Sequence, residues 1–240
     1  MKPKKVAIVT GATKGLGRAT AVFLASRGYA VAVNYRASRV NAETTLREGE
    51  KIGNGILIQA DVTKQSQAIV DRVMKEWGRV DVLVNNVGNF HYKTLGQTTA
   101  EEWNEVFESN LTSVFGMTQA VLPIMRKQHF GRVICYAAAG ADRGITRART
   151  IPYDIAKAGV LALVRHLAYE EAARGITVNC ISPGVLETSV AKQGILPPIG
   201  RYIQFEDILR TIAFYLDSPA VTGANIEVAG GWDPRVLTGF

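Results

Sequence analysis

Short apolar runs alternate along the whole chain with longer stretches whose apolar residues recur at helical spacing. The apolar, β-branched runs predict strands at about 5–10, 30–35, 55–60, 80–85, 131–136, 176–181 and 225–229. Long helices are expected from Glu101 to Lys127 and from Tyr153 to Arg174, the second stopped by Gly175. Alternating strands and helices indicate a parallel sheet covered on both faces. We therefore predict one α/β domain over residues 1–240, with a Rossmann-like, doubly wound sheet of about seven strands.

One segment, residues 184–203, interrupts this alternation. Glycine and proline recur there, at Gly184, Gly194, Pro197, Pro198 and Gly200, and the apolar periodicity is lost. Loops at the carboxyl ends of strands form the binding site in doubly wound sheets. We expect this segment to be a substrate loop.

The first apolar run leads into a glycine-rich turn and then a helical stretch. The turn reads Thr10-Gly11-Ala12-Thr13-Lys14-Gly15-Leu16-Gly17. Glycines let the backbone approach a phosphate closely, and the helix start offers unpaired N–H groups and the positive end of its dipole. The pattern predicts a cradle for a pyrophosphate. A tight connection without a ligand is the alternative, because the spacing departs from Gly-x-Gly-x-x-Gly.

Tyr153 and Lys157 are the strongest candidates for proton transfer. Their four-residue spacing places both side chains on one face of a helix. An adjacent positive charge favours the phenolate and lowers the pKa of a tyrosine from its usual value of about 10. The pair would suit chemistry at a carbonyl or an alcohol. An exposed pair without a function is the alternative for this motif taken alone.

Other polar motifs follow the predicted strands. They are Asp61-Val62, Asn85-Asn86-Val87-Gly88, the helix residue Asn110, and Pro183-Gly184-Val185-Leu186-Glu187-Thr188. With the glycine turn and the Tyr153–Lys157 pair, they make the chain resemble the short-chain dehydrogenase/reductase family nearly end to end. Within that family it is most similar to the 3-oxoacyl-[acyl-carrier-protein] reductases.

The resemblance implies hydride transfer between a nicotinamide and a carbonyl, with Tyr153 as the proton donor. Lys157 would hold the ribose hydroxyls and lower the pKa of Tyr153, and Asn110 would support a proton relay through a water. The remaining implied cofactor contacts are Asp61 and Val62 at the adenine, and Asn86, Gly88, Pro183, Gly184 and Thr188 around the nicotinamide. Simpler roles stay open: Asn110 could bond a helix carbonyl, Asp61 could cap a helix and Thr188 could be a surface residue.

The residues after the second predicted strand indicate which nicotinamide cofactor is used. An NAD site usually has an acid there to bind the ribose 2′-OH, but this chain has Asn34, Tyr35 and Arg36. Arg36 can pair with a 2′-phosphate, and the resemblance makes Lys14 a second basic contact. We therefore expect NADP(H). A solvated Arg36 without a ligand is the alternative.

One departure from the family is the serine that normally follows the fifth strand. Counting forward from Gly131 gives Ala138 at its position, whereas counting back from Tyr153 gives Gly140, because this loop is about two residues longer. Tyr136, Thr146 and Thr150 are the nearest hydroxyls. We expect Thr146, Thr150 or a water to contact the substrate oxygen. The alternative function is a dinucleotide-binding protein with weak or no turnover.

Composition excludes several other classes. Hydrophobic residues make up 47% and charged residues 20% of the chain, and no apolar run approaches the roughly 18 residues of a membrane helix. The net charge of +7 comes from dispersed basic residues without an aromatic-basic groove motif, so nucleic acid is not an expected partner. The resemblance implies that the substrate is a small carbonyl compound or an acyl thioester, free or on acyl carrier protein.

The cysteines and histidines form no predicted metal site or disulfide. Cys135 and Cys180 lie in apolar runs that suit buried thiols, and His91, His129 and His166 are scattered. The basic start passes directly into a strand, so the cytoplasm is the expected location. The resemblance also implies a homotetramer.

Overall fold

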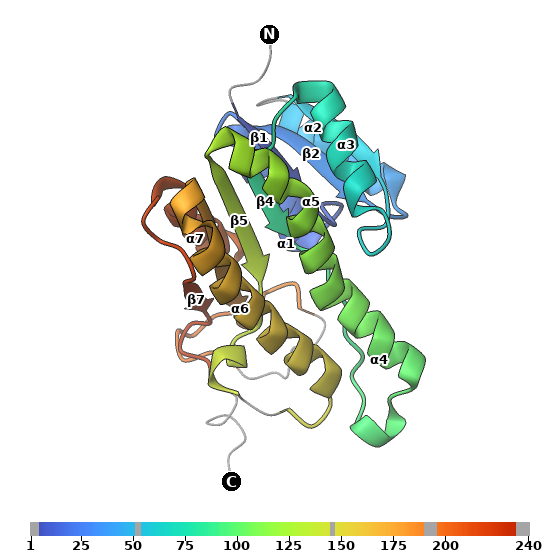
Figure 1. Ribbon diagram of the computed structural model, residues 1–240. Coiled ribbons are helices and arrows are strands. Elements are labelled where there is room, and N and C mark those ends of the chain that lie inside the picture. The colour runs from blue at the N-terminus through green and yellow to red at the C-terminus, as the bar shows by residue number, and fades with distance from the viewer. Residues whose placement is uncertain (1–4, 51–53, 145–146, 190–195, 234–240) are drawn as a thin grey trace.

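Seven parallel strands form one sheet in the computed structural model, which describes residues 5–50, 54–144, 147–189 and 196–233. The strand order is β3-β2-β1-β4-β5-β6-β7. Their bounds are β1 Val6–Val9, β2 Ala30–Tyr35, β3 Gly55–Gln59, β4 Val82–Asn85, β5 Gly131–Tyr136, β6 Ile176–Pro183 and β7 Asn225–Val228. The predicted doubly wound, Rossmann-like fold is confirmed (Figure 1).

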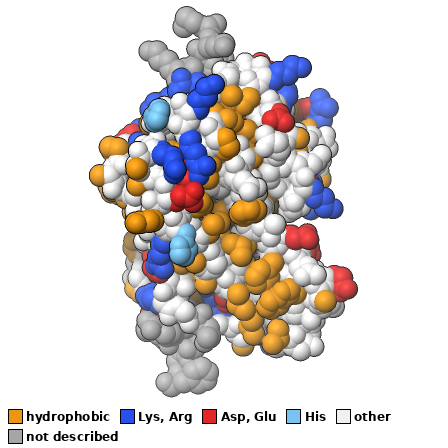
Figure 2. Space-filling model, viewed as in Figure 1, with side chains coloured by type: hydrophobic (Ala, Val, Ile, Leu, Met, Phe, Trp, Pro, Cys, Tyr) orange, Lys and Arg blue, Asp and Glu red, His pale blue; other side chains and the backbone are white. Residues whose placement is uncertain are grey.

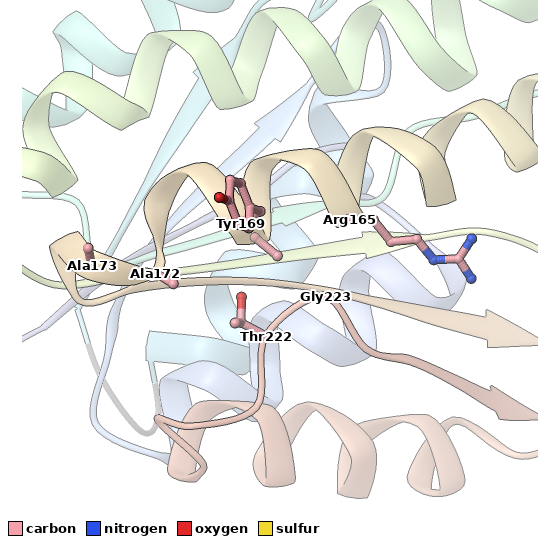
Figure 3. Close-up of a pocket in the computed structure, with 7 residues that line it drawn as sticks. Arg165, Tyr169, Ala172, Ala173, Thr222 and Gly223 are labelled. Carbon is pink, nitrogen blue, oxygen red and sulfur yellow. The ribbon is translucent and has the colours of Figure 1, made fainter.

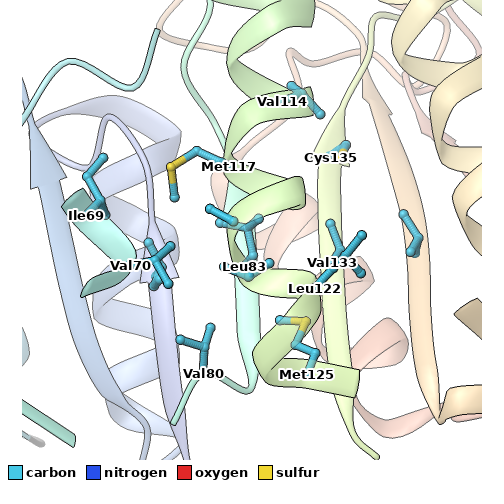
Figure 4. Close-up of a cluster of buried hydrophobic side chains, with 14 of the residues drawn as sticks. Ile69, Val70, Val80, Leu83, Val114, Met117, Leu122, Met125, Val133 and Cys135 are labelled. Atoms are coloured by element: carbon cyan, nitrogen blue, oxygen red, sulfur yellow. The ribbon is translucent and has the colours of Figure 1, made fainter. Parts of the chain in front are cut away.

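Helices cover both faces of the sheet because residues along each strand alternate between two cores. Val6 and Ile8 of β1 pack with α3 (Ser66–Trp77), α5 (Ser113–Gln128) and α6 (Ile151–Glu171), the cluster in Figure 4. Ala7 and Val9 pack on the other face, with α1 (Gly15–Ser26), α2 (Arg39–Glu50) and α7 (Phe205–Asp217). Because the strands are buried on both faces, their sequences are continuous apolar runs.

Left-handed residues end several helices, and the sequence predicts one of these ends, at Gly175. Gly175 has φ +73 after α6 and a short 3₁₀ turn, Ala172–Arg174, and Gly78 has φ +73 after α3. A residue without a Cβ adopts this conformation at no steric cost, and the chain then turns into the next strand. The predicted stop at Gly175 is therefore confirmed.

The helix expected from Glu101 to Lys127 is interrupted. It consists of α4 (Ala100–Phe107), a π-helical turn (Glu108–Thr112) and α5. Within the turn, the Asn110 side-chain amide donates to the Val106 carbonyl at 2.9 Å and to the Asn89 carbonyl at 2.7 Å. Single π turns inside helices are frequent at functional sites, and this one carries Asn110.

The direction in which strands are added reverses at β1. β2 lies on one side of β1 and β4 on the other, so the topological switch point, beside which doubly wound sheets bind their ligands, lies between β1 and β4. The glycine turn follows β1 and Asn86 follows β4. No helix in the described part of the chain is long and apolar enough to cross a membrane.

Candidate active site

The glycine turn is folded tightly against the end of β4. Gly11 has φ +60, and a Cβ there would lie 2.9 Å from Val87 Cγ2. A Cβ at Gly17 would collide with Asn86 Nδ2 and lie 2.5 Å from the Gly11 carbonyl oxygen. Gly15, with φ +54, faces open space, and the N-cap residue Lys14 gives the start of α1 no side-chain hydrogen bond. Open backbone at the N-terminus of a twelve-residue helix can hold a pyrophosphate.

Polar side chains that are buried or half-buried hold this turn in place. Thr10 Oγ1 accepts the Asn86 backbone N–H at 2.9 Å, and Asn86 Nδ2 donates to the carbonyls of Thr10 and Gly11 at 3.0 and 3.1 Å. Asn34 is also buried: its amide donates to the Ile58 and Ala60 carbonyls, and its oxygen accepts the Gly11 N–H at 3.4 Å. The side chains of Thr10, Asn34 and Asn86 thus hold the glycine turn in position through hydrogen bonds with backbone groups.

Arg36 and Asp61 lie together beyond the ends of β2 and β3. The Arg36 side chain is 76% exposed, and its Nη1 lies 3.9 Å from Asp61 Oδ2. Burial opposes ionisation of Asp61, but two hydrogen bonds from Thr63 and the nearby charges of Arg36 and Lys64 hold its pKa below the usual value. The structure leaves Arg36 accessible to an anion. Tyr35 and Val62, expected at the cofactor, have side chains buried in the core.

Asp61 does not fill the simpler role considered for it, a cap on α3, because the N-cap residue is Gln65 and no side-chain cap hydrogen bond is present. The Asp61 carbonyl accepts the N–H groups of Lys64 and Gln65 at 3.1 and 2.8 Å, and its side chain bonds Thr63. These bonds build the turn that precedes α3. Asp61 Oδ2 remains directed at Arg36, so a structural and a binding role are compatible in this residue.

Tyr153, Lys157, Asn110 and Gly88 come together beside the carboxyl ends of β4 and β5. Lys157 Nζ lies 5.5 Å from the Tyr153 ring centroid and donates to the Tyr136 carbonyl at 2.8 Å. A Cβ at Gly88 would collide with Asn110 Oδ1 and lie 3.6 Å from Lys157 Nζ. The expected catalytic residues Asn110, Tyr153 and Lys157 therefore share one site, although they come from two separate segments.

Asn110 has one unused hydrogen-bonding atom. The side chain is fully buried, and its Nδ2 donates to the Asn89 and Val106 carbonyls. Its Oδ1 has no hydrogen-bond partner within the described ranges. A buried acceptor without a donor is costly, and a bound water would satisfy it. The helix-carbonyl bond considered as an alternative is present, and it leaves Oδ1 for a proton relay.

The expected effect of Lys157 on the pKa of Tyr153 is wrong for the protein alone. Burial raises the pKa of Tyr153 to about 12, with Arg147 acting in the lowering direction and Asp154 in the raising direction. Burial lowers the pKa of Lys157 to about 8, against the raising effects of Cys180 and Cys135. Lys157 is not among the groups that shift the pKa of Tyr153: its ammonium donates to the Tyr136 carbonyl and lies over the face of the tyrosine ring.

The segment that should carry a serine contains only small apolar residues. Ala137, Ala138 and Ala139 are all buried. Gly140 has φ +83, a conformation that strains any residue with a Cβ, so the geometry favours Ala138 as the serine position. Gly140 also donates its backbone N–H to Glu227 at 3.0 Å.

The hydroxyls expected to replace the serine are placed differently. Thr150 is buried and donates to Asp154 Oδ2 at 2.9 Å. The Tyr136 hydroxyl lies 3.3 Å from Thr20 Oγ1, in the core on the α1 side of the sheet. Thr146 lies outside the described residues. Neither described hydroxyl is free to face Tyr153 as a donor.

Two residues at the site were not predicted as site residues from the sequence. The Phe90 ring is tilted at 57° to the Tyr153 ring with centroids 5.7 Å apart, and it is 38% exposed. Arg147 lies near enough to Tyr153 to influence its pKa. Neither belongs to a recognisable spacing pattern. Only the packing of the loops after β4 and β5 around Tyr153 identifies them.

The segment after β6 is described only in part. Gly184 donates its N–H to the Val228 carbonyl at 2.9 Å, and a Cβ there would lie 2.8 Å from Ala229 Cα. Pro183 ends β6 and is half-buried, and Thr188 is exposed. Leu186 forms an isolated parallel bridge with Ile203, which ties together the two ends of the segment expected to be a substrate loop. Residues 190–195 of that loop lie outside the described ranges.

An open groove lies at the other end of α6. It is lined by Arg165, Ala168, Tyr169, Ala172, Ala173, Thr222 and Gly223, most of them visible in Figure 3. Arg165 is twelve residues beyond Tyr153, or roughly 18 Å along a helix. The groove is therefore separate from the catalytic cluster. Among the described residues, no group of three or more histidine, cysteine or acidic side chains could hold a metal ion.

Comparisons with known proteins identify the family. A family model described as enoyl-(acyl carrier protein) reductase matches residues 11–233. The 3-oxoacyl-[acyl-carrier-protein] reductases FabG of Staphylococcus aureus and Escherichia coli are 37% and 34% identical, over 96% and 95% of this chain and 99% and 96% of theirs. A solved structure assigned as a short-chain alcohol dehydrogenase from Sinorhizobium meliloti 1021 has a TM-score of 0.89 at 26% identity, covering 95% of this chain and 96% of its own. With the fold and the clustered motifs, these matches establish that the chain belongs to the short-chain dehydrogenase/reductase family.

Proposed function

We propose that this protein is an NADP(H)-dependent oxidoreductase that reduces a carbonyl group, with Tyr153 as the proton donor. The observation that carries the proposal is the convergence of Tyr153, Lys157 and the unpaired Asn110 Oδ1 beside a glycine turn that can hold a pyrophosphate. The FabG relatives are named as reductases of 3-oxoacyl groups on acyl carrier protein. A 3-oxoacyl thioester is therefore the proposed substrate class.

The proposed chemistry divides between the cofactor and the chain. A bound reduced nicotinamide would supply the hydride to the carbonyl carbon. Tyr153 is protonated at neutral pH, because burial raises its pKa to about 12, and it would give its proton to the carbonyl oxygen. Lys157, with a pKa of about 8, can return a proton to Tyr153 through a water held at Asn110 Oδ1. The carbonyl is thereby reduced to an alcohol.

The preference for NADP(H) is supported by the charges around the cradle. Arg36 is exposed at the end of β2, Lys14 is exposed in the glycine turn, and no acidic residue directly follows β2. Among the described carboxylates, that of Asp61 lies nearest to Arg36, at 3.9 Å. An exposed ion pair at this distance is weak, so the Arg36 guanidinium can still bind a 2′-phosphate. Pro183, Gly184 and Thr188 are proposed at the nicotinamide end.

A second candidate function is dinucleotide binding with weak or no turnover. It is favoured by one observation: no described hydroxyl takes the place of the expected serine, because Ala138 has none and the Thr150 hydroxyl donates to Asp154. A purified-protein screen separates the two functions. NADPH oxidation, followed by its absorbance, should be stimulated by at least one of a set of 3-oxoacyl thioesters, diketones and small aldehydes. Tight NADPH binding without oxidation by any of them would favour the second function.

Oligomerisation is proposed on similar grounds. Apolar side chains gather across the face that carries α4, α5 and α6 (Figure 2), where Phe115 is 50%, Ile155 47% and Tyr169 92% exposed. An apolar surface of this kind is typical of an interface, which supports the proposed homotetramer. Sedimentation at micromolar concentration should give the tetramer, and a monomer alone would contradict it. We also propose that the protein is located in the cytoplasm.

A further inference from the structure

The loop between β5 and α6 brings an arginine to the place from which the serine is missing. Arg147 Nη2 donates to the Ala139 carbonyl at 3.1 Å, and Ala139 is the neighbour of Ala138. The same nitrogen lies 3.1 Å from Asp154 Oδ1, one residue beyond Tyr153. The guanidinium carbon lies 5.8 Å from the Trp232 ring centroid. These three contacts hold the side chain close to Ala139, the neighbour of Ala138, and to Asp154, the neighbour of Tyr153.

The guanidinium has a buried donor that nothing in the described protein uses. Arg147 Nε is inaccessible to solvent and has no hydrogen-bond partner among the described residues. Buried N–H groups without acceptors are rare, because their lost hydration is not replaced. The Arg147 side chain as a whole is 28% exposed, so a bound ligand can reach it. The Arg147 charge also lowers the pKa of Tyr153 against the raising effect of burial, which places the guanidinium within electrostatic reach of the phenol.

The lengthened loop supplies no comparable donor among its described hydroxyls. The Thr150 hydroxyl donates to Asp154 Oδ2, and Tyr136 places its hydroxyl against Thr20 across the sheet. The alanines from 137 to 139 are buried and carry no hydroxyl. A guanidinium is charged at all working pH values and donates strong hydrogen bonds to oxyanions.

We propose that Arg147 is a further catalytic residue, whose guanidinium donates a hydrogen bond to the substrate's carbonyl oxygen in place of the family's serine. This inference rests on the proposed function. As hydride reaches the carbonyl carbon, negative charge develops on the oxygen that Tyr153 then protonates, and Arg147 stabilises that charge. Asp154 is a positioning residue, because its carboxylate holds the guanidinium on one side.

The test is a double-mutant cycle between the two positions, using NADPH and acetoacetyl-CoA as the probe. Arg147→Met removes the donor but keeps an extended side chain, and kcat should fall by about 10²-fold with KM little changed. Ala138→Ser should recover most of this loss in the Arg147→Met background and gain little in the wild-type background. Arg149→Met is the matched control, since Arg149 is an exposed arginine of the same loop placed over the Tyr92 ring. It should leave kcat unchanged.

A binding measurement supplies a readout that needs no turnover. Calorimetric titration of 3-hydroxybutyryl-CoA into NADPH-saturated protein forms a complex that cannot react, and Arg147→Met should weaken this binding by about tenfold. If Arg147→Met keeps kcat and binding, the inference is wrong while the proposed function stands. A second outcome would also contradict the inference: kcat falls in Arg147→Met, Ala138→Ser does not restore it, and 3-hydroxybutyryl-CoA binds as tightly as before. Arg147 would then only support the loop.

The wild-type protein decides the remaining outcomes. If it neither reduces acetoacetyl-CoA nor binds 3-hydroxybutyryl-CoA, the thioester reductase function fails and the inference falls with it. Binding without turnover that still depends on Arg147 would support the contact with the substrate oxygen, even though the proposed function would then be limited to binding.

Discussion

Replacing Lys157 with methionine should change how the stability of the protein depends on pH. Burial lowers the pKa of Lys157 from 10.5 to about 8, with Cys180 and Cys135 opposing the shift. Between these two values the unfolded chain holds a proton that the folded protein has released. Raising the pH therefore favours the folded state, and the contribution of Lys157 to stability increases with pH. Methionine fills similar space and cannot titrate.

The magnitude follows from the size of the shift. Each unit of pKa difference corresponds to about 1.4 kcal/mol, so the free energy of unfolding of the wild type should rise relative to Lys157→Met by about 2 kcal/mol between about pH 7.5 and about pH 9.5. The difference between the two proteins is the useful quantity. Burial raises the pKa of Cys135 to about 11 and that of Cys180 as well, and these thiols lower the stability of both proteins as the pH rises.

Urea unfolding of the apo protein, followed by circular dichroism at several pH values, measures this difference. Tyr153→Phe is the control, because it leaves Lys157 in place and should keep the wild-type dependence over this range. A difference between wild type and Lys157→Met that stays flat with pH would refute the reasoning. It would mean that Lys157 is well solvated or paired when the cofactor is absent.

Two further predictions concern the cofactor. Gly17→Ala should destabilise the protein by about 1 to 3 kcal/mol and abolish NADPH binding, since the new Cβ would lie 2.5 Å from the Gly11 carbonyl and displace Asn86; unchanged urea unfolding and NADPH fluorescence titrations would contradict this. Arg36→Met should weaken NADPH binding by at least about tenfold and leave NADH binding unchanged, as measured by the same titrations. Wild-type protein that binds NADH more tightly than NADPH would overturn the assignment of NADP(H).

The strands could be predicted closely because their positions depend on burial on both faces. β2 and β5 begin and end where the apolar runs do, at Ala30–Tyr35 and Gly131–Tyr136. The break between α4 and α5 could not be predicted in this way. It depends on the bond from Asn110 to the Asn89 carbonyl, a tertiary contact across 21 residues that leaves no periodic signal.

Site residues were predictable where a motif fixes their spacing, and less so where a tertiary contact decides the role. Tyr153 and Lys157 lie on one helix, so their proximity follows from the sequence, but the direction of their pKa shifts depends on burial that only the fold reveals. Asn34 lies at the end of β2, where a cofactor contact was expected. Its side-chain amide instead donates to the carbonyls of Ile58, in β3, and Ala60. Arg147 has no spacing signal, because a loop of unusual length places it.

The central claim is that Tyr153 gives the proton in reduction of a carbonyl, and Tyr153→Phe tests it most directly. With a substrate found in the NADPH screen, the variant should reduce it at least about 10²-fold more slowly, because the ring remains and only the acidic hydroxyl is lost. NADPH binding should persist, since the glycine turn and Arg36 are untouched. Turnover equal to that of the wild type would contradict the claim and remove Tyr153 from the mechanism.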